Sequence, residues 1–321
     1  MESFFQGLSL WLNLAFFVLG IAAVIWGAGR FTEGAVGIAE ATGVPKMVVG
    51  ATVVSVATTL PEFSVSTVAA ALERPATSVG NAVGSTICNI GLILALAALI
   101  RPVRFPQNAV RTQGLAMCAA GLLLVALIWN GVLDRGEGWL LLAAAALYLW
   151  DSMRRSGWNG KNGGGGSSSH EWGPLLGRFT VGALGVVGGS VLLVQNVTPI
   201  ARAMGMPELV IALTLVAVGT SLPELITAVS SSLRGHGEIA VGNVMGANIL
   251  NITWVLGASS AIFPLPIEPQ TFRLDVPAMG IMMVLFVGMM GFRGRAGRLS
   301  GGLLLSAYIL YLGLMIAWFV L

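Results

Sequence analysis

The sequence is poor in charge, since Asp, Glu, Lys and Arg together make up 10% of its 321 residues, whereas soluble domains carry about 25%. So few charges cannot cover the surface of a water-soluble globule. Hydrophobic residues reach 56% and gather in runs long enough to cross a bilayer as helices. These runs do not alternate apolar and polar residues, which excludes the strands of a transmembrane barrel. We therefore expect an all-α integral membrane protein.

Cysteine is also scarce. Cys88 and Cys118 both fall inside apolar runs, where a thiol behaves as a small hydrophobe, so neither indicates a redox compartment. The net charge of +3 comes from basic residues in the polar connections and indicates membrane orientation, not nucleic-acid binding. The run that starts near Leu10 is followed by no cleavage pattern of small residues, so we expect it to remain as a span.

Ten transmembrane helices are expected, near 9–28, 46–72, 78–100, 110–131, 138–152, 178–202, 208–233, 239–262, 272–292 and 299–320. Of the 17 basic residues, 13 fall in the connections on one side of this arrangement and four on the side of the termini. The positive-inside rule then predicts a multi-pass protein of the cell membrane with both termini extracytoplasmic.

The polar segment 153–174 contains GGGGSSS and is typical of a flexible linker, here cytoplasmic. It separates a first half, 1–152, from a second half, 175–321, each with five expected spans. Because five is an odd number, the two halves cross the membrane in opposite orientation. The prediction is a pair of inverted five-helix repeats with discontinuous ion-binding helices.

The two halves share a repeat at an offset of 162 residues. Residues 45–100 align with 207–262 without a gap and with about 18 identities. The identities include Thr, Pro, Glu and Asn, in the paired motifs VATTLPE and VGTSLPE and the paired motifs VGNAVGSTICNI and VGNVMGANILNI. A shared apolar composition does not explain polar identities, because lipid excludes these residues.

Two acidic residues, Glu62 and Glu224, fall deep within expected helices, at equivalent places in the repeat. No Lys or Arg is expected at that depth to pair with them. Pro61 and Pro223 each precede the Glu and remove a helical donor, which frees backbone carbonyls near Thr58 and Thr220. The hydroxyls of Thr58, Thr59, Thr220 and Ser221 add further oxygen atoms.

This all-oxygen environment with two carboxylates favours Ca²⁺, which takes six to eight oxygen ligands, over Mg²⁺, zinc or copper. The plainer alternative is a pair of proline kinks with protonated glutamates, which the occurrence of TxLPE in both repeats disfavours. Asn89 and Asn251 each follow the Glu of their repeat and can offer a neutral oxygen. We expect Asn81 and Asn243 to bond helix to helix, and Gly80, Gly84, Gly242 and Gly246 to allow close helix packing.

With these motifs the chain resembles the sodium/calcium exchanger family of the cation/calcium antiporter superfamily, prokaryotic type, whose repeats carry GTSLPE and GNxxGSNIxN. The resemblance implies a calcium site formed by Glu62, Glu224 and the carbonyls of Thr58 and Thr220. It also implies sodium-binding or supporting residues, namely Ser55, Thr59, Asn89, Ala217, Ser221, Asn251 and Ser85.

The sequence departs from the family pattern in both repeats. Ala57, Thr59, Thr86 and Ala247 stand where the motifs have Gly, Ser, Asn and Ser. In several relatives the position of Asn251 is an acid, which the potassium-dependent branch ties to potassium. The amide of Asn251 thus argues against potassium coupling.

The expected function is secondary antiport of Ca²⁺ and Na⁺ by alternating access, with both ions as substrates and no organic cofactor. The small-residue segments GIAA and GALGVVGG of the first and sixth helices are candidates for a sliding gate. The expected partners are the lipid bilayer and the two ions, without nucleic acid or an obligate protein partner. A Ca²⁺/H⁺ antiporter on the same fold is the main alternative. An intramembrane hydrolase and a cation channel fit the residues less well.

Overall fold

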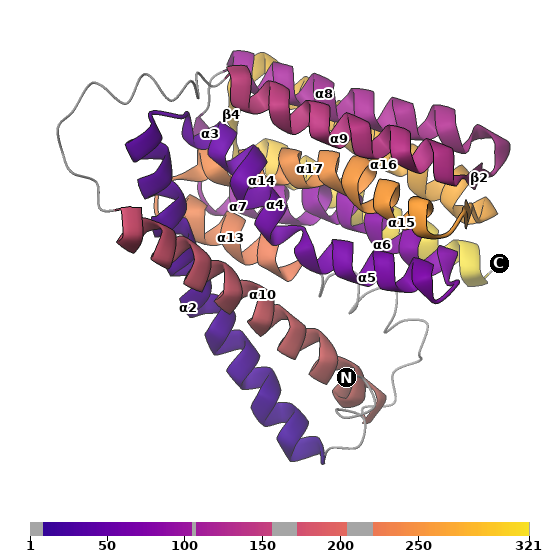
Figure 1. The fold of residues 1–321 in the computed structure, drawn as a ribbon, viewed down its shortest axis with the longest axis horizontal. Coiled ribbons are helices and arrows are strands. Elements are labelled where there is room, and N and C mark those ends of the chain that lie inside the picture. Colours follow the sequence, from indigo (N-terminus) through magenta and orange to yellow (C-terminus); the bar gives the residue numbers. More distant parts are fainter. Residues whose placement is uncertain (1–8, 105–106, 156–171, 204–220, 321) are drawn as a thin grey trace.

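The computed structural model describes residues 9–104, 107–155, 172–203 and 221–320. Helices dominate it, with two short antiparallel β pairs in the connections (Figure 1). The elements of the first half are, in chain order, α2 (Leu10–Thr42), α3 (Lys46–Val49), η1 (Gly50–Val54), α4 (Ser55–Thr58), α5 (Leu60–Ala71), α6 (Pro75–Cys88), η2 (Asn89–Leu94), α7 (Ala95–Ile100), β1 (Val103–Arg104), α8 (Gln107–Leu127), η3 (Ile128–Asn130), β2 (Val132–Leu133) and α9 (Arg135–Arg155).

The second half is also mainly helical. Its elements are α10 (Trp172–Ala203), α13 (Leu222–Leu233), α14 (Gly237–Leu250), η5 (Asn251–Val255), α15 (Leu256–Ile262), β3 (Leu265–Pro266), η6 (Thr271–Asp275), α16 (Val276–Arg293), β4 (Arg295–Ala296) and α17 (Arg298–Val320). Most of the expected linker, 156–171, lies outside the described residues.

Within the described residues, six helical segments are long and apolar enough to span a membrane. A seventh is added if the bent pair Lys46–Thr58 and Leu60–Ala71 counts as one span. The chain is thus a mainly helical membrane protein. The number ten stays a prediction, because α9 and α10 are not among these segments and the expected span 208–233 is described only from residue 221.

The first helix is longer than expected, since α2 continues past residue 28 to Thr42. No proline interrupts this stretch, and Arg30 and Glu33 form an ion pair at 4.0 Å one turn apart on its surface, a spacing that supports helix. The helix ends where Gly43 adopts a left-handed conformation, with φ of +68°, as is common at helix C-termini. Hydropathy locates the membrane-length part of a helix but not its polar extension.

The two segments that carry the second motif of each repeat form the centre of the molecule. Pro75–Ile100 is 72% buried and Gly237–Ile262 is 94% buried over their apolar windows. The asparagines of both segments, namely Asn81, Asn89, Asn243, Asn248 and Asn251, are all buried. The helices α2 and α10 lie side by side and apart from most of the other helices (Figure 1).

Glycine lets α2 and α10 approach to backbone contact. A Cβ on Gly27 would lie 2.7 Å from the backbone nitrogen of Val186, and one on Gly34 would lie 2.5 Å from that of Phe179. Side chains larger than hydrogen at these positions would push the two helices apart.

The two β pairs lie at opposite ends of the molecule (Figure 1). One joins Val103 to Ala296, and the other joins Val132 to Pro266. Each pair connects a loop of the first half to a loop of the second half. The halves are thus tied to each other at both ends.

Candidate ion-binding site

A break in the helix positions Glu62. The arm Lys46–Thr58 and the arm Leu60–Ala71 meet at an angle of 44°, with Thr59 between them. Pro61 lies in the first turn of α5, where its missing N–H leaves no helical bond unmade. The break expected at this proline is therefore present, and it places Glu62 in the first turn of α5, where the helix dipole favours a negative charge.

The second repeat places Glu224 in the same way. Ser221 precedes α13, Pro223 lies in its first turn, and Glu224 follows directly. Residues 204–220, with two expected ligands, Ala217 and Thr220, lie outside the described residues.

The two carboxylates are buried and are held across the repeats. Ser221 Oγ donates to Glu62 Oε1 at 3.1 Å, and Thr59 Oγ1 donates to Glu224 Oε1 at 3.5 Å. Glu62 is 0% exposed and Glu224 is 1% exposed. Each half thus supplies the carboxylate of one pair and the hydroxyl of the other, and we call this arrangement the crossed pairs.

In the described part of the chain, each carboxylate has one oxygen without a hydrogen-bond partner. The Oε2 atoms of Glu62 and Glu224 have no hydrogen-bond partner among the described residues. The ion pairs of the described chain involve neither glutamate. Since a buried carboxylate without a partner costs several kcal/mol, these two oxygens are suited to bind a cation.

Two asparagines fix the backbone and hydroxyls around the glutamates. Asn81 Nδ2 donates to the backbone oxygen of Glu62 at 3.2 Å and to Ser66 Oγ at 2.9 Å. Thr58 Oγ1 donates to Asn243 Oδ1 at 3.1 Å. Asn81 and Asn243 therefore join helices, as the sequence predicted.

The remaining expected site residues of the described chain are all buried, namely Ser55, Ser85, Asn89 and Asn251. The hydroxyl of Ser55 donates to the backbone oxygen of Thr52 at 3.1 Å. Asn89 and Asn251 each open a π-helical segment, η2 and η5. Such widened turns occur often at functional sites, and nothing in the sequence pattern had indicated them.

The close helix packing expected at glycine is present in the second repeat. A Cβ on Gly242 would overlap the carbonyl oxygen of Met47, and one on Gly246 would overlap that of Ala51. No described atom lies within 4 Å of a Cβ built on Gly80 or Gly84. Of the four motif glycines, Gly242 and Gly246 therefore show this role among the described residues.

Asp275 is a buried acid that sequence reasoning did not select. It is 8% exposed and accepts a hydrogen bond from the hydroxyl of Tyr311 at 2.9 Å. Asp275 lies near the N-terminal end of the expected span 272–292, where an acidic residue is not unusual and so was not singled out. Its tyrosine partner makes it a link between η6 and α17.

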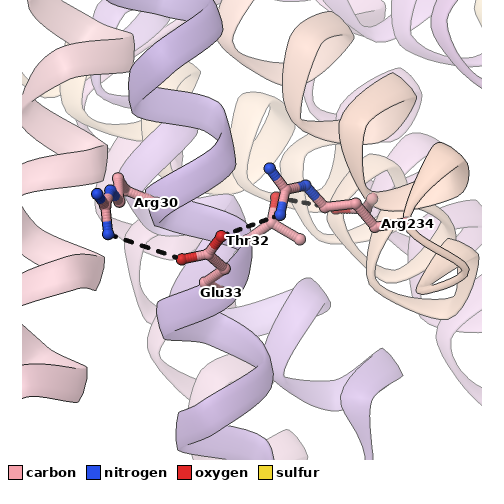
Figure 2. Close-up of polar contacts among 5 residues, drawn as sticks. Arg30, Thr32, Glu33 and Arg234 are labelled. Carbon is pink, nitrogen blue, oxygen red and sulfur yellow. Dashed lines mark hydrogen bonds and ion pairs between the residues drawn. The ribbon is translucent and has the colours of Figure 1, made fainter.

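A separate cavity of about 530 Å³ lies between α2, α10 and the connection before α14, and its lining includes none of the proposed ion ligands. Figure 2 shows Glu33 between two arginines, with Oε1 3.0 Å from Arg234 Nη1. Beside it, the hydroxyls of Thr32 and Ser231 lie 3.4 Å apart. Burial and the charge of Lys46 lower the pKa of His236 on the lining, which favours the neutral imidazole. The contact between Glu33 and Arg234 and the contact between Thr32 and Ser231 join α2 to the C-terminal end of α13.

Comparisons with known proteins agree over nearly the whole chain. Residues 12–153 and 174–317 match the family model described as sodium/calcium exchanger protein. The chain is 33% identical to inner membrane protein YrbG of Escherichia coli (strain K12), over 95% of this chain and 97% of YrbG. It is 28% identical to sodium/calcium exchanger MaX1 of Methanosarcina acetivorans, over 94% of this chain and 97% of MaX1.

A solved structure shares the fold. The sodium-calcium exchanger NCX_Mj, soaked with 10 mM Na⁺ and 10 mM Sr²⁺, superposes with a TM-score of 0.85 at 31% sequence identity, over 95% of this chain and 99% of that one. With the family model matching both halves, the chain belongs to the sodium/calcium exchanger protein family.

Proposed function

We propose that this protein is a secondary antiporter that exchanges Ca²⁺ for Na⁺ by alternating access. The observation that carries the proposal is the crossed pairs. In them, two buried carboxylates each accept a hydroxyl of the opposite half, and neither has a basic partner among the described residues. Two carboxylates neutralise one divalent ion, and hydroxyl and carbonyl oxygens complete the kind of shell that calcium takes. Family membership supports a transporter over an enzyme, and the related MaX1 is named a sodium/calcium exchanger.

The proposed architecture is ten spans in two inverted five-helix repeats, 1–152 and 175–321. Its support is the offset of 162 residues, under which α5 corresponds to α13 and α6 with η2 corresponds to α14 with η5. The crossed pairs also relate the two repeats reciprocally, as a two-fold axis in the membrane would require.

The proposed ligands fall into a calcium set and a sodium set. For calcium they are Glu62 and Glu224 with the carbonyls of Thr58 and Thr220. The neutral oxygens suit sodium, and they belong to Ser55, Thr59, Asn89, Ala217, Ser221 and Asn251, with Ser85 in support. In this arrangement the glutamates serve both ions, so that calcium and sodium compete, and the pair α2 and α10 supplies the moving gate.

Sodium, not a proton gradient, should drive calcium uptake. Proteoliposomes loaded with Na⁺ and diluted into sodium-free buffer are expected to accumulate radioactive calcium, because the neutral oxygens listed above suit Na⁺ and a proton carrier needs the carboxylates alone. The matched control is the same vesicles with a pH gradient and no sodium on either side. Uptake that follows the pH gradient and ignores sodium would instead establish the Ca²⁺/H⁺ antiporter.

The proposed orientation puts both termini outside the cytoplasm and the segment 153–174 inside it. In a background without Cys88 and Cys118, a cysteine introduced by Gly173→Cys should resist an impermeant thiol reagent applied to whole cells. A cysteine introduced by Glu268→Cys should react, because it lies in an exposed connection on the other side. Both should react after permeabilisation, and the reverse pattern in whole cells would invert the topology.

A further inference from the structure

Among the described residues, Asn89 is the one proposed sodium residue whose side-chain amide is held by a second amide. Its Nδ2 donates to Asn248 Oδ1 at 3.0 Å. Both asparagines are fully buried, since each is 0% exposed. Asn248 lies in α14 of the second half, so this contact also joins the two halves.

The orientation of Asn248 is set by a thioether. Its Nδ2 donates to Met117 Sδ of α8 at 3.7 Å, and a thioether can accept a hydrogen bond but cannot donate one. If the Asn248 amide were turned over, its oxygen would face the sulfur lone pairs and this bond would be lost. Met117 therefore selects one of the two amide orientations.

The orientation of the Asn248 amide determines which side-chain atom of Asn89 remains without a hydrogen bond. With Asn248 Oδ1 occupied by the N–H of Asn89, the Oδ1 of Asn89 has no hydrogen-bond partner among the described residues and is fully buried. A free carbonyl oxygen is what a sodium ion requires, whereas a free N–H₂ group would repel it.

In the described part of the chain, Asn251 of the second repeat has no equivalent anchor. The residue at the position equivalent to Asn248 is Thr86, and its hydroxyl donates to the backbone oxygen of Ala82 at 2.9 Å. Both amide atoms of Asn251 are without a partner in the described part of the chain. The two amides, equivalent in the sequence repeat, therefore differ in how firmly they are oriented.

We propose that Asn248, anchored by Met117, is a positioning residue that turns the amide oxygen of Asn89 toward a bound sodium ion. The inference rests on the proposed function for the identity of the ion, and it goes beyond it by separating the roles of the two repeats. Asn89 is the preoriented sodium ligand and Asn251 is the one that adjusts its amide when the ion binds.

The test measures ion binding without transport. Purified protein in detergent is titrated with Na⁺, and separately with Ca²⁺, and the concentration that gives half of the maximal rise in Tm is recorded, since a ligand that binds the folded state stabilises it. Asn248→Leu should raise this concentration for Na⁺ by about fivefold, the effect of one net amide hydrogen bond. The value for Ca²⁺ should change less than about twofold, because Asn89 is not a calcium ligand.

Met117→Leu keeps the shape of the side chain and removes only the sulfur acceptor. It should weaken Na⁺ binding in the same direction but less, by about twofold to threefold, and it preserves the test if Asn248→Leu fails to fold. The matched control is Met283→Leu, a buried methionine of α16 whose sulfur packs near Gly121. It should leave both titrations unchanged.

An unchanged Na⁺ titration in Asn248→Leu or Met117→Leu, or an equal weakening of Na⁺ and Ca²⁺, would overturn the positioning role. Failure of the proposed function is a different result. The wild-type protein would bind Na⁺ in the detergent titration, but its proteoliposomes would take up no calcium under a sodium gradient. A Na⁺ titration that still depends on Asn248 would in that case uphold the positioning role.

Discussion

Glu62→Gln and Glu224→Gln are each expected to abolish sodium-driven calcium uptake. Either change leaves an oxygen that can accept the hydroxyl of Ser221 or Thr59, so the crossed pairs keep their geometry. What is lost is one of two negative charges in a buried site, and removing one partner of a buried charge interaction costs about 3–5 kcal/mol. Calcium affinity should then fall by roughly a hundredfold or more, as measured by uptake into proteoliposomes across a range of calcium concentrations.

The matched control for this pair is Glu268→Gln, which removes the charge of an exposed acid far from the expected span interior. Its uptake should equal that of the wild-type protein. The Tm values of Glu62→Gln and Glu224→Gln in ion-free buffer should not fall, because each change removes a buried charge with no basic partner in the described chain. Wild-type uptake by both glutamine variants would place the calcium site elsewhere.

Gly246→Ala is expected to have the second largest effect. The added Cβ would overlap the carbonyl oxygen of Ala51 and lie 2.5 Å from the hydroxyl of Ser55. Because the oxygen of Ala51 belongs to the backbone and cannot rotate away as a side chain can, α14 and η1 must separate. Overpacking of this kind costs about 1–3 kcal/mol, and it displaces Ser55, a proposed sodium ligand. Both the Tm in detergent and the apparent affinity for Na⁺ in the uptake assay should fall.

Gly313→Ala provides the comparison, because Gly313 is exposed on α17 and no described atom lies within 4 Å of the added carbon. Alanine favours helix over glycine, so its Tm should stay the same or rise slightly. If Gly246→Ala matched Gly313→Ala in Tm and in sodium dependence, the tight contact between α14 and η1 would have no part in shaping the site.

The two glutamates could be located from the sequence because the internal repeat allows each half of the chain to be aligned with the other. Lipid excludes polar residues unless they are needed, so Glu62 and Glu224 stood out from an apolar background, and Pro61 correctly predicted the break in the helix. The repeat could not show that each hydroxyl serves the opposite half, because alignment identifies equivalent residues and not residues in contact.

Other features were out of reach for physical reasons. The π-helical turns at Asn89 and Asn251 depend on packing and have no sequence pattern of their own. Asn248 was missed because Thr86 replaces asparagine in the first repeat, so the internal comparison gave it no weight. The extension of α2 to Thr42 was missed because the charges of Arg30, Glu33 and Glu40 marked this stretch as a polar connection.

The crossed pairs also constrain the order of events during synthesis. Glu62 reaches its hydroxyl partner only after Ser221 has been made, and Glu224 needs Thr59 from a segment inserted long before. Until the second half has been made, Glu62 therefore lacks the hydroxyl that its Oε1 accepts in the folded protein. Two separately produced halves would each be unable to bind calcium tightly, and mixing them should restore binding only when they assemble side by side.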